Sequence, residues 1–198
     1  FVEGHKRQFP QAVTSAGWGD VITVLPWVLY QYYGDKAVLE ENYEAMERWL
    51  AYVRNTAKTE NPSELHGVTG ARKEHLEYIW NTNFHFGDWL TPSVSINMES
   101  GMMDMLQSAL QTKEIVPTFF YAYSCSILSK VSKILGKDDK RAYYDGLFEK
   151  IKEAFQYEYV NEDGTIKSDL QGIQVLALHM GLVDGKAKEQ TEKKLVEL

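Results

Sequence analysis

Apolar positions alternate between two kinds of helical pattern along the chain. From about residue 20 to 33, apolar side chains cover every face of a predicted helix, so we expect protein on all sides of it. From about residue 36 to 56, they form one stripe at spacings of three and four, opposite a charged face. The first segment is therefore predicted to be an inner helix and the second an outer one.

Local signals mark the junction between these two helices. Pro26 lies inside the first helix and predicts a bend there, because proline cannot donate the helical hydrogen bond. Gly34 predicts a left-handed residue at the end of the first helix, and Asp35 is a plausible N-cap of the second.

The alternation of inner and outer helices occurs three times. Gly136 and Gly181 end the second and third inner helices. Alternating helices of this kind predict an all-α fold, an α/α toroid, in which an inner ring is enclosed and an outer ring faces water. An α-solenoid is the alternative, but we find no self-similarity at a fixed period. The predicted hairpins are about 20–56, 118–155 and 169–198.

The connection between the first two hairpins, about 57–116, is long for a compact domain. It is rich in aromatic residues, which argues against disorder and favours a packed loop over the mouth of the inner helices. These aromatic residues are Tyr78, Trp80, Phe84, Phe86 and Trp89.

Composition narrows the class of function. The 198 residues carry a formal charge of −7 and have no long basic run, so we expect no nucleic-acid partner. The longest nearly uncharged stretch, 92–112, contains Glu99 and Asp104, so we expect no membrane insertion. Cys125 is the one cysteine, which excludes an internal disulfide and a multi-thiolate metal site.

Two short motifs are the strongest candidates for chemistry. Gly17-Trp-Gly-Asp20 precedes the first inner helix, and Phe86-Gly-Asp-Trp-Leu90 lies in the long connection. Each places a carboxylate beside an indole, and an indole face packs on the C–H face of a sugar while a carboxylate accepts its hydroxyl protons. The alternatives are an N-cap for Asp20, a turn residue for Asp88, and core packing for Trp18 and Trp89.

Other residues carry weaker signals. The histidines lack metal-ligand spacing, Cys125 is expected to act as a small hydrophobic side chain, and no phosphate-binding or nucleophile motif is present. We therefore expect no metal and no cofactor. The histidines in question are His66, His75, His85 and His179.

The amino-acid sequences of several segments are similar to those of a known family. These are residues 17–35 (Gly-Trp-Gly-Asp-Val-Ile-Thr-Val-Leu-Pro-Trp-Val-Leu-Tyr-Gln-Tyr-Tyr-Gly-Asp), Leu39-Glu-Glu-Asn-Tyr, Met46-Glu-Arg-Trp-Leu50, the motif at 86–90, and Ala154-Phe with Asn161-Glu-Asp-Gly164. Together they resemble the bacterial α-L-rhamnosidases of glycoside hydrolase family 78, over essentially the whole chain.

The resemblance implies a six-hairpin (α/α)6 barrel, of which residues 1–198 would supply three hairpins. It implies hydrolysis of terminal α-L-rhamnose with inversion, which needs a catalytic acid and a catalytic base. The family's motif for the acid and its glutamate base are not found here, so no catalytic residue is assigned. Trp18 and Trp89 would line the rhamnose pocket, and Asp20 and Asp88 would hold hydroxyls or orient neighbouring loops.

The ends of the chain suggest a segment of a longer protein. It opens at Phe1 without methionine and stops within a helical pattern. Its expected partners are a rhamnose-containing carbohydrate and the rest of the parent chain, and the segment alone is expected to be inactive. The compartment is not indicated. Two alternatives remain: another (α/α)6 glycosidase, and a non-catalytic helical domain that binds carbohydrate or protein.

Overall fold

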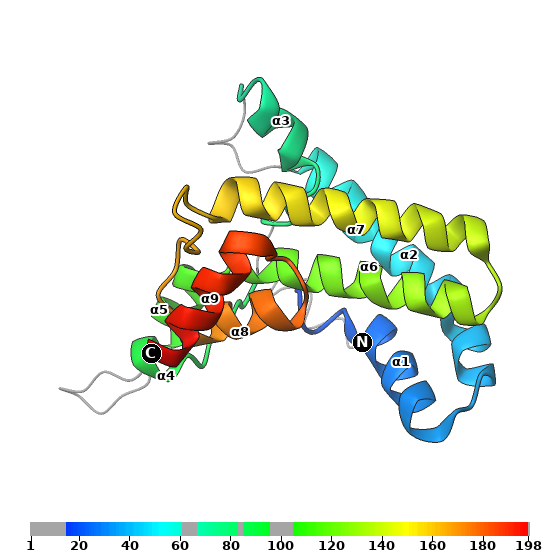
Figure 1. The fold of residues 1–198 in the computed structure, drawn as a ribbon. Helices are drawn as coiled ribbons and strands as arrows, with labels where there is room; N and C mark the ends of the chain where they lie inside the picture. The colour runs from blue at the N-terminus through cyan, green and yellow to red at the C-terminus, as the bar shows by residue number, and fades with distance from the viewer. Residues whose placement is uncertain (1–14, 61–66, 83–84, 96–104, 198) are drawn as a thin grey trace, which may run out of the picture.

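The computed structural model describes residues 15–60, 67–82, 85–95 and 105–197, and these residues form helices joined by loops (Figure 1). Among them the backbone pairs in β fashion only at the isolated bridge between Val160 and Ile166. The helices are α1 (Val21–Tyr33), α2 (Ala37–Thr59), α3 (Ala71–Leu76), α4 (Pro92–Ser95), α5 (Met105–Thr112), α6 (Val116–Ile134), α7 (Asp138–Tyr159), α8 (Gln171–His179) and α9 (Gly185–Glu197).

Three helical hairpins organise the described residues. Helix α1 packs on α2, α6 on α7 and α8 on α9, while α6 also contacts α1, α2 and α8. Helices α6 and α8 run in the same direction, and α7 and α9 return antiparallel to them (Figure 1). The predicted all-α architecture of inner and outer helices is confirmed.

The junction between α1 and α2 follows its local signals. Gly34 has a φ of 67°, and its N–H donates to the Tyr30 carbonyl at 2.8 Å, which ends α1 as predicted. Asp35 Oδ1 accepts the Ala37 N–H at 2.9 Å, so its carboxylate satisfies a free donor at the start of α2. The N-cap position is Lys36 and not Asp35 as predicted, because the first helical hydrogen bonds of α2 run to the Lys36 carbonyl.

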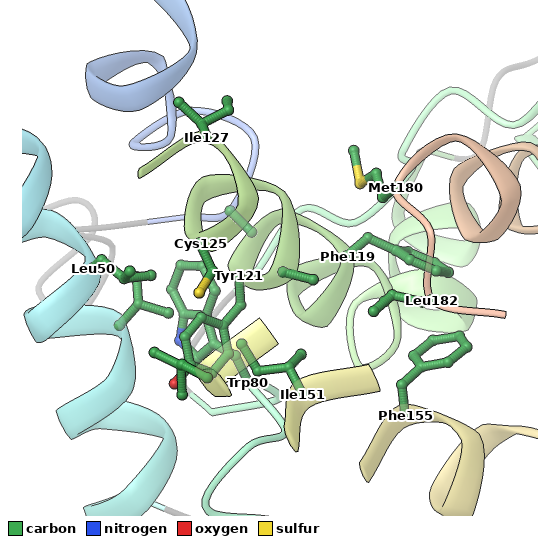
Figure 2. Packing of buried hydrophobic residues seen from close by; sticks show 14 of the residues in the cluster. Leu50, Trp80, Phe119, Tyr121, Cys125, Ile127, Ile151, Phe155, Met180 and Leu182 are labelled. Carbon is green, nitrogen blue, oxygen red and sulfur yellow. The ribbon is translucent and has the colours of Figure 1, made fainter. Parts of the chain in front are cut away.

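The hydrophobic core is centred on α6. Phe119, Cys125 and Ile127 of α6 are fully buried. Phe155 of α7 packs on Phe119 with ring centroids 5.0 Å apart, whereas Ile127 points away from α7 (Figure 2). The Cys125 thiol donates to the Tyr144 carbonyl at 3.2 Å, and burial raises the pKa of that thiol. Cys125 thus lies in the core, in agreement with the expectation that it acts as a small hydrophobic side chain.

Helix α1 is less enclosed than its sequence predicts. Only Thr23 and Pro26 are fully buried, whereas Val21 and Leu25 are 55% and 50% exposed. The reason is that α1 contacts α2 and α6 on one side and has no comparable neighbour on the other among the described residues. An apolar face of an inner helix is therefore left open in this chain.

The long connection contains helices that the sequence analysis did not predict. Helices α3, α4 and α5 lie in it, and all three are too short to show a clear apolar period. Trp80 is 1% exposed, packs edge-on against Trp49 at 6.0 Å between ring centroids, and donates its backbone N–H to Thr118 Oγ1 at 3.1 Å. This part of the connection is packed into the core. Phe84 lies outside the described residues.

Candidate functional site

The two sequence motifs, about 70 residues apart, meet in space. The Ala16 N–H donates to His85 Nδ1 at 3.1 Å, and the Phe86 N–H donates to Ser15 Oγ at 3.2 Å. These two contacts fix the segment before α1 against the start of the second motif. The structure therefore brings together the residues that the sequence analysis selected from separate segments.

Three aromatic rings form a group at this junction, which we call the aromatic cluster: Trp18, Phe86 and Trp89. The ring centroid of Trp18 lies 6.2 Å from that of Phe86 and 6.3 Å from that of Trp89, and Phe86 and Trp89 are 5.5 Å apart. Trp18 is 60% exposed and Trp89 is half-buried, so Trp18 does not have the core position that was its alternative assignment. The cluster offers indole surface to solvent.

Asp20, two residues after Trp18, is 1% exposed. Its Oδ1 accepts hydrogen bonds from Trp49 Nε1 at 2.9 Å and Ser124 Oγ at 2.8 Å, and its Oδ2 accepts the Gly17 N–H at 2.9 Å. Burial raises the pKa of the Asp20 carboxyl, and the three donated hydrogen bonds oppose that shift. The carboxylate ties the turn before α1 to α2 and α6.

Asp20 occupies the N-cap position of α1, but its side chain does not cap the helix. It reaches back to Gly17 instead of forward into the first turn. The turn it holds is crowded: a Cβ on Gly19 would lie 2.1 Å from the Trp49 ring. Glycine is thus required at position 19, where the backbone approaches an indole closely.

Asp88 is held by polar side chains of α5 and of its own turn. Its N–H donates to Thr112 Oγ1 at 2.8 Å, and its carbonyl accepts from Ser108 Oγ at 2.5 Å. Thr91 Oγ1 donates to Asp88 Oδ2 at 2.6 Å. Asp88 Oδ1 accepts no hydrogen bond from the described residues, so one carboxylate oxygen remains available at the half-buried side chain.

Asp88 also lies at the beginning of α8. A Cβ built on Gly172 would approach Asp88 Oδ2 to 3.0 Å, which shows how closely the α8 backbone passes the carboxylate. The second motif therefore contacts the segment before α1 through Phe86, and the start of α8 through Asp88; His85, just before the motif, adds a second contact to the segment before α1.

The sequence analysis missed the supporting role of three residues: His85, Ser108 and Thr112. His85 is 1% exposed, and burial lowers its pKa to about 4, so the ring is neutral and accepts the Ala16 N–H. Ser108 and Thr112 are four residues apart and therefore share one face of α5. That spacing is a signal in the sequence, but nothing in it shows that Asp88 is the partner.

No three His, Cys, Asp or Glu side chains of the described residues are grouped to hold a metal ion. None of the helices described is both long enough and apolar enough to cross a bilayer. His66 lies outside the described residues.

The helical hairpins define an all-α domain in which the indoles of Trp18 and Trp89 lie close together, and sequence comparison identifies the family. Residues 7–198 match the bacterial alpha-L-rhamnosidase 6 hairpin glycosidase domain, and the chain belongs to this family. Its all-α hairpins agree with the six-hairpin architecture.

Curated relatives and solved structures agree with this assignment. The chain is 30% identical over 185 residues to an alpha-L-rhamnosidase of Formosa agariphila and 31% identical over 183 residues to one of Streptomyces avermitilis. Each alignment covers 92% of this chain but only 17% and 14% of the relative. The chain therefore corresponds to a small part of these enzymes.

Two solved structures have the same fold over this segment. The Streptomyces avermitilis alpha-L-rhamnosidase complexed with L-rhamnose matches with a TM-score of 0.68 at 30% identity, covering 92% of this chain and 14% of that chain. The native Aspergillus terreus enzyme matches with a TM-score of 0.70 at 24% identity, covering 92% of this chain and 18% of that chain, and at that identity it supports the fold alone.

Proposed function

We propose that the complete protein containing this chain removes terminal α-L-rhamnose from glycosides or polysaccharides, and that this chain supplies part of its sugar-binding surface. The observation that carries the proposal is the aromatic cluster, in which Trp18 and Trp89, from motifs about 70 residues apart, present indole surface beside Asp88. Membership of the rhamnosidase family and the L-rhamnose bound in one solved relative support the choice of sugar.

The side chains of the cluster suit a 6-deoxy sugar. Indole faces pack against the C–H bonds of a pyranose ring, and the apolar wall favours the C6 methyl group over a hydroxymethyl group. Trp18 is the more exposed of the two indoles and is therefore the better placed to meet a ligand. Trp89 lies beside it with ring centroids 6.3 Å apart, and would extend the same wall.

The two carboxylates have different proposed roles. Asp88 keeps Oδ1 free of described protein donors and can accept a sugar hydroxyl proton. Both oxygens of Asp20 are bound by protein donors, so we assign Asp20 to orienting the turn that carries Trp18. Neither is proposed as the catalytic acid or base.

Inverting hydrolysis needs an acid that protonates the leaving oxygen and a base that activates water on the opposite face of the sugar. We propose that both groups come from parts of the complete protein outside this chain. The role of the described residues is then to bind the ring and to keep bulk water from its apolar face. The segment alone is accordingly proposed to be inactive.

The proposal is tested on the complete protein with an aryl α-L-rhamnoside, following the anomeric proton of the released sugar by NMR. Early appearance of the β-anomer is the expected result. Trp89→Ala should raise KM about tenfold or more, because the rhamnose ring loses part of the apolar wall that it packs against. Release of no rhamnose contradicts the assigned sugar, and an unchanged KM and kcat in Trp89→Ala contradicts the assigned pocket.

A further inference from the structure

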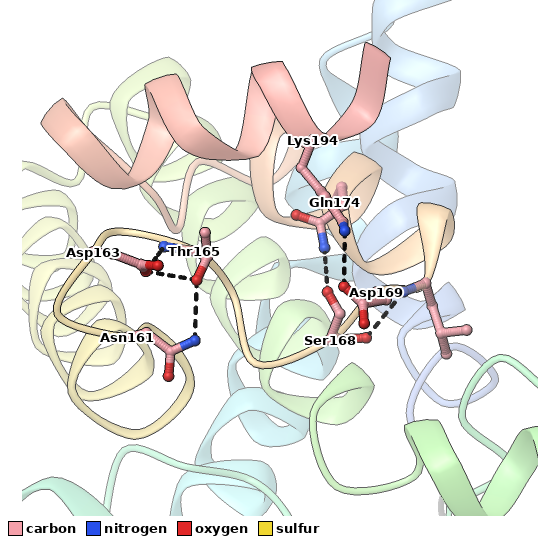
Figure 3. A network of polar contacts seen from close by, with 8 residues as sticks. Asn161, Asp163, Thr165, Ser168, Asp169, Gln174 and Lys194 are labelled. Atoms are coloured by element: carbon pink, nitrogen blue, oxygen red, sulfur yellow. Dashed lines mark hydrogen bonds and ion pairs between the residues drawn. The ribbon is translucent and has the colours of Figure 1, made fainter. Parts of the chain in front are cut away.

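A second polar feature lies between the α7–α8 loop, α8 and α9 (Figure 3). It is a pocket of about 270 Å³, which we call the α8–α9 pocket. This volume lies just below the range of about 300–1,000 Å³ that is usual for drug-sized ligands, so it suits a small molecule. Its polar lining includes Thr165, Ser168, Asp169, Gln174, Gln190 and Lys194.

Gln174 is the residue that points to a ligand. It is 1% exposed, and its Nε2 donates to the Ser168 carbonyl at 2.7 Å (Figure 3). Because a carbonyl can only accept, the amide nitrogen must face Ser168, which fixes the orientation of the amide. Its Oε1 then has no hydrogen-bond partner among the described residues, although it is buried and belongs to a residue that lines the pocket. A buried acceptor of this kind is costly unless a donor reaches it.

The charged groups of the pocket are already engaged. Lys194 Nζ lies 2.9 Å from Asp169 Oδ1, and Lys167 Nζ donates to the Glu158 carbonyl at 2.8 Å. An ionic ligand would have to compete with these contacts. The neutral polar groups that remain include Gln174 Oε1, the Gln190 amide and the Ser168 hydroxyl proton, which pair well with neutral hydroxyl groups.

The wall of the pocket is held in place by its own hydrogen bonds. Asp163 Oδ1 accepts the Thr165 N–H at 2.9 Å and the Thr165 hydroxyl at 2.6 Å, and Asn161 Nδ2 donates to Thr165 Oγ1 at 3.0 Å (Figure 3). A Cβ on Gly164 would lie 3.2 Å from Gln190 Cγ, so the turn packs directly on α9. A preorganised wall reduces the entropy lost when a ligand binds.

We propose that the α8–α9 pocket binds a neutral, hydroxyl-rich ligand of the size of one sugar ring, with a ligand hydroxyl donating to Gln174 Oε1. The hydroxyl chemistry follows from the pocket itself. The choice of a sugar, and of rhamnose as the first probe, rests on the function proposed above. The pocket shares no residue with the aromatic cluster.

The test is calorimetric titration of the complete protein with L-rhamnose, D-galactose and the rhamnose-containing disaccharide rutinose. It is carried out in a Trp18→Ala/Trp89→Ala background, which removes the aromatic cluster. Gln174→Leu should weaken binding of the best probe at least tenfold and Gln190→Leu at least threefold. Gln31→Leu, an exposed glutamine of α1, is the matched control and should leave the affinity unchanged.

The outcomes separate the sources of the ligand. Equal affinity for monosaccharide and disaccharide identifies a free sugar, and preference for rutinose identifies a sugar unit within a glycan. Gln190 is partly exposed, so its variant keeps the proposal falsifiable if Gln174→Leu does not fold. Absence of binding by all three probes, or an unchanged affinity in Gln190→Leu, overturns the proposal.

The failure of this proposal and that of the rhamnosidase function are distinguishable. Hydrolysis of the aryl α-L-rhamnoside is measured on the protein with its tryptophans intact, and sugar binding is measured without them. A protein that binds D-galactose through Gln174 but releases no rhamnose retains the pocket and loses the proposed function. A protein that hydrolyses the rhamnoside but binds none of the three probes keeps the proposed function and loses the pocket.

Discussion

At the scale of single residues, the junction before α1 is determined by close packing around one buried carboxylate. Asp20 was selected from the sequence because it follows Trp18 and Gly19, and that selection did find the junction. Its burial could not be predicted, because its donors Trp49 and Ser124 are 29 and 104 positions away. A single sequence shows which residues can form hydrogen bonds but not which distant partners reach them.

Gly19→Ala tests how tightly this junction is packed. The added Cβ would lie 2.1 Å from the Trp49 ring, so the indole or the turn must move, and we expect a loss of about 1–3 kcal/mol in unfolding free energy. Gly146→Ala is the matched control, because that glycine lies in α7 with open space around it and should gain up to about 1 kcal/mol. Urea unfolding of the complete protein measures both, and equal effects would contradict the close approach.

His85 makes the same junction sensitive to acid. Its pKa is about 4 in the folded protein, below the ordinary value of 6.5, so folding favours the neutral ring. The resulting stability is present above pH 6.5 and is lost as the pH falls toward 4. The difference between these two pKa values corresponds to about 3 kcal/mol of unfolding free energy once the pH has fallen below both of them.

Urea midpoints between pH 7 and 4 measure this contribution. The wild-type protein should lose more stability over that range than His85→Asn, whose side chain does not titrate but can still accept the Ala16 N–H. Parallel pH profiles for the two proteins would show that His85 does not take up its proton on unfolding.

At the scale of elements, the long helices were predictable and the short ones were not. Helices α1, α2, α6 and α7 each span more than three turns, so their apolar periods show in the sequence. Helix α5 has eight residues, and its importance comes from the two hydroxyls that it directs at Asp88 rather than from an apolar stripe. Hydrogen bonds from single side chains to a distant loop leave no periodic pattern in the sequence.

Thr112→Val tests whether α5 positions the second motif. The substitution keeps the shape but leaves the Asp88 N–H without its acceptor, at a cost of about 1–3 kcal/mol. In the complete protein, we expect KM for an aryl α-L-rhamnoside to rise about tenfold while kcat changes less, because Asp88 is proposed to bind rather than to react.

Two variants make the result specific. Thr112→Ser retains the hydroxyl and should restore KM to near the wild-type value. Thr59→Val removes an exposed hydroxyl that bonds Asn55 at the end of α2, and should leave both constants unchanged. A fall in kcat with KM unchanged would assign Thr112 a different role.

At the scale of the whole molecule, the inner helices α1 and α8 leave aliphatic side chains exposed. Val21 and Leu25 of α1 are 55% and 50% exposed, and Val175 of α8 is 45% exposed. The sequence predicted α1 to be enclosed, and the structure encloses it on one side only. Since the chain covers 14–18% of its relatives' length, we propose that further parts of the toroid cover this face in the complete protein.

This leads to a prediction for the isolated 198-residue chain. Contiguous exposed apolar surface favours association, so we expect sedimentation velocity to show oligomers that increase with concentration. Val21→Lys/Leu25→Lys should shift the chain toward monomer, because it places two charges on the open face of α1. Val196→Lys is the control, since Val196 is 89% exposed on the outer helix α9 and should have little effect. A monodisperse wild-type monomer that melts cooperatively would show that the three hairpins need no covering half, and the partial-toroid interpretation would then be wrong.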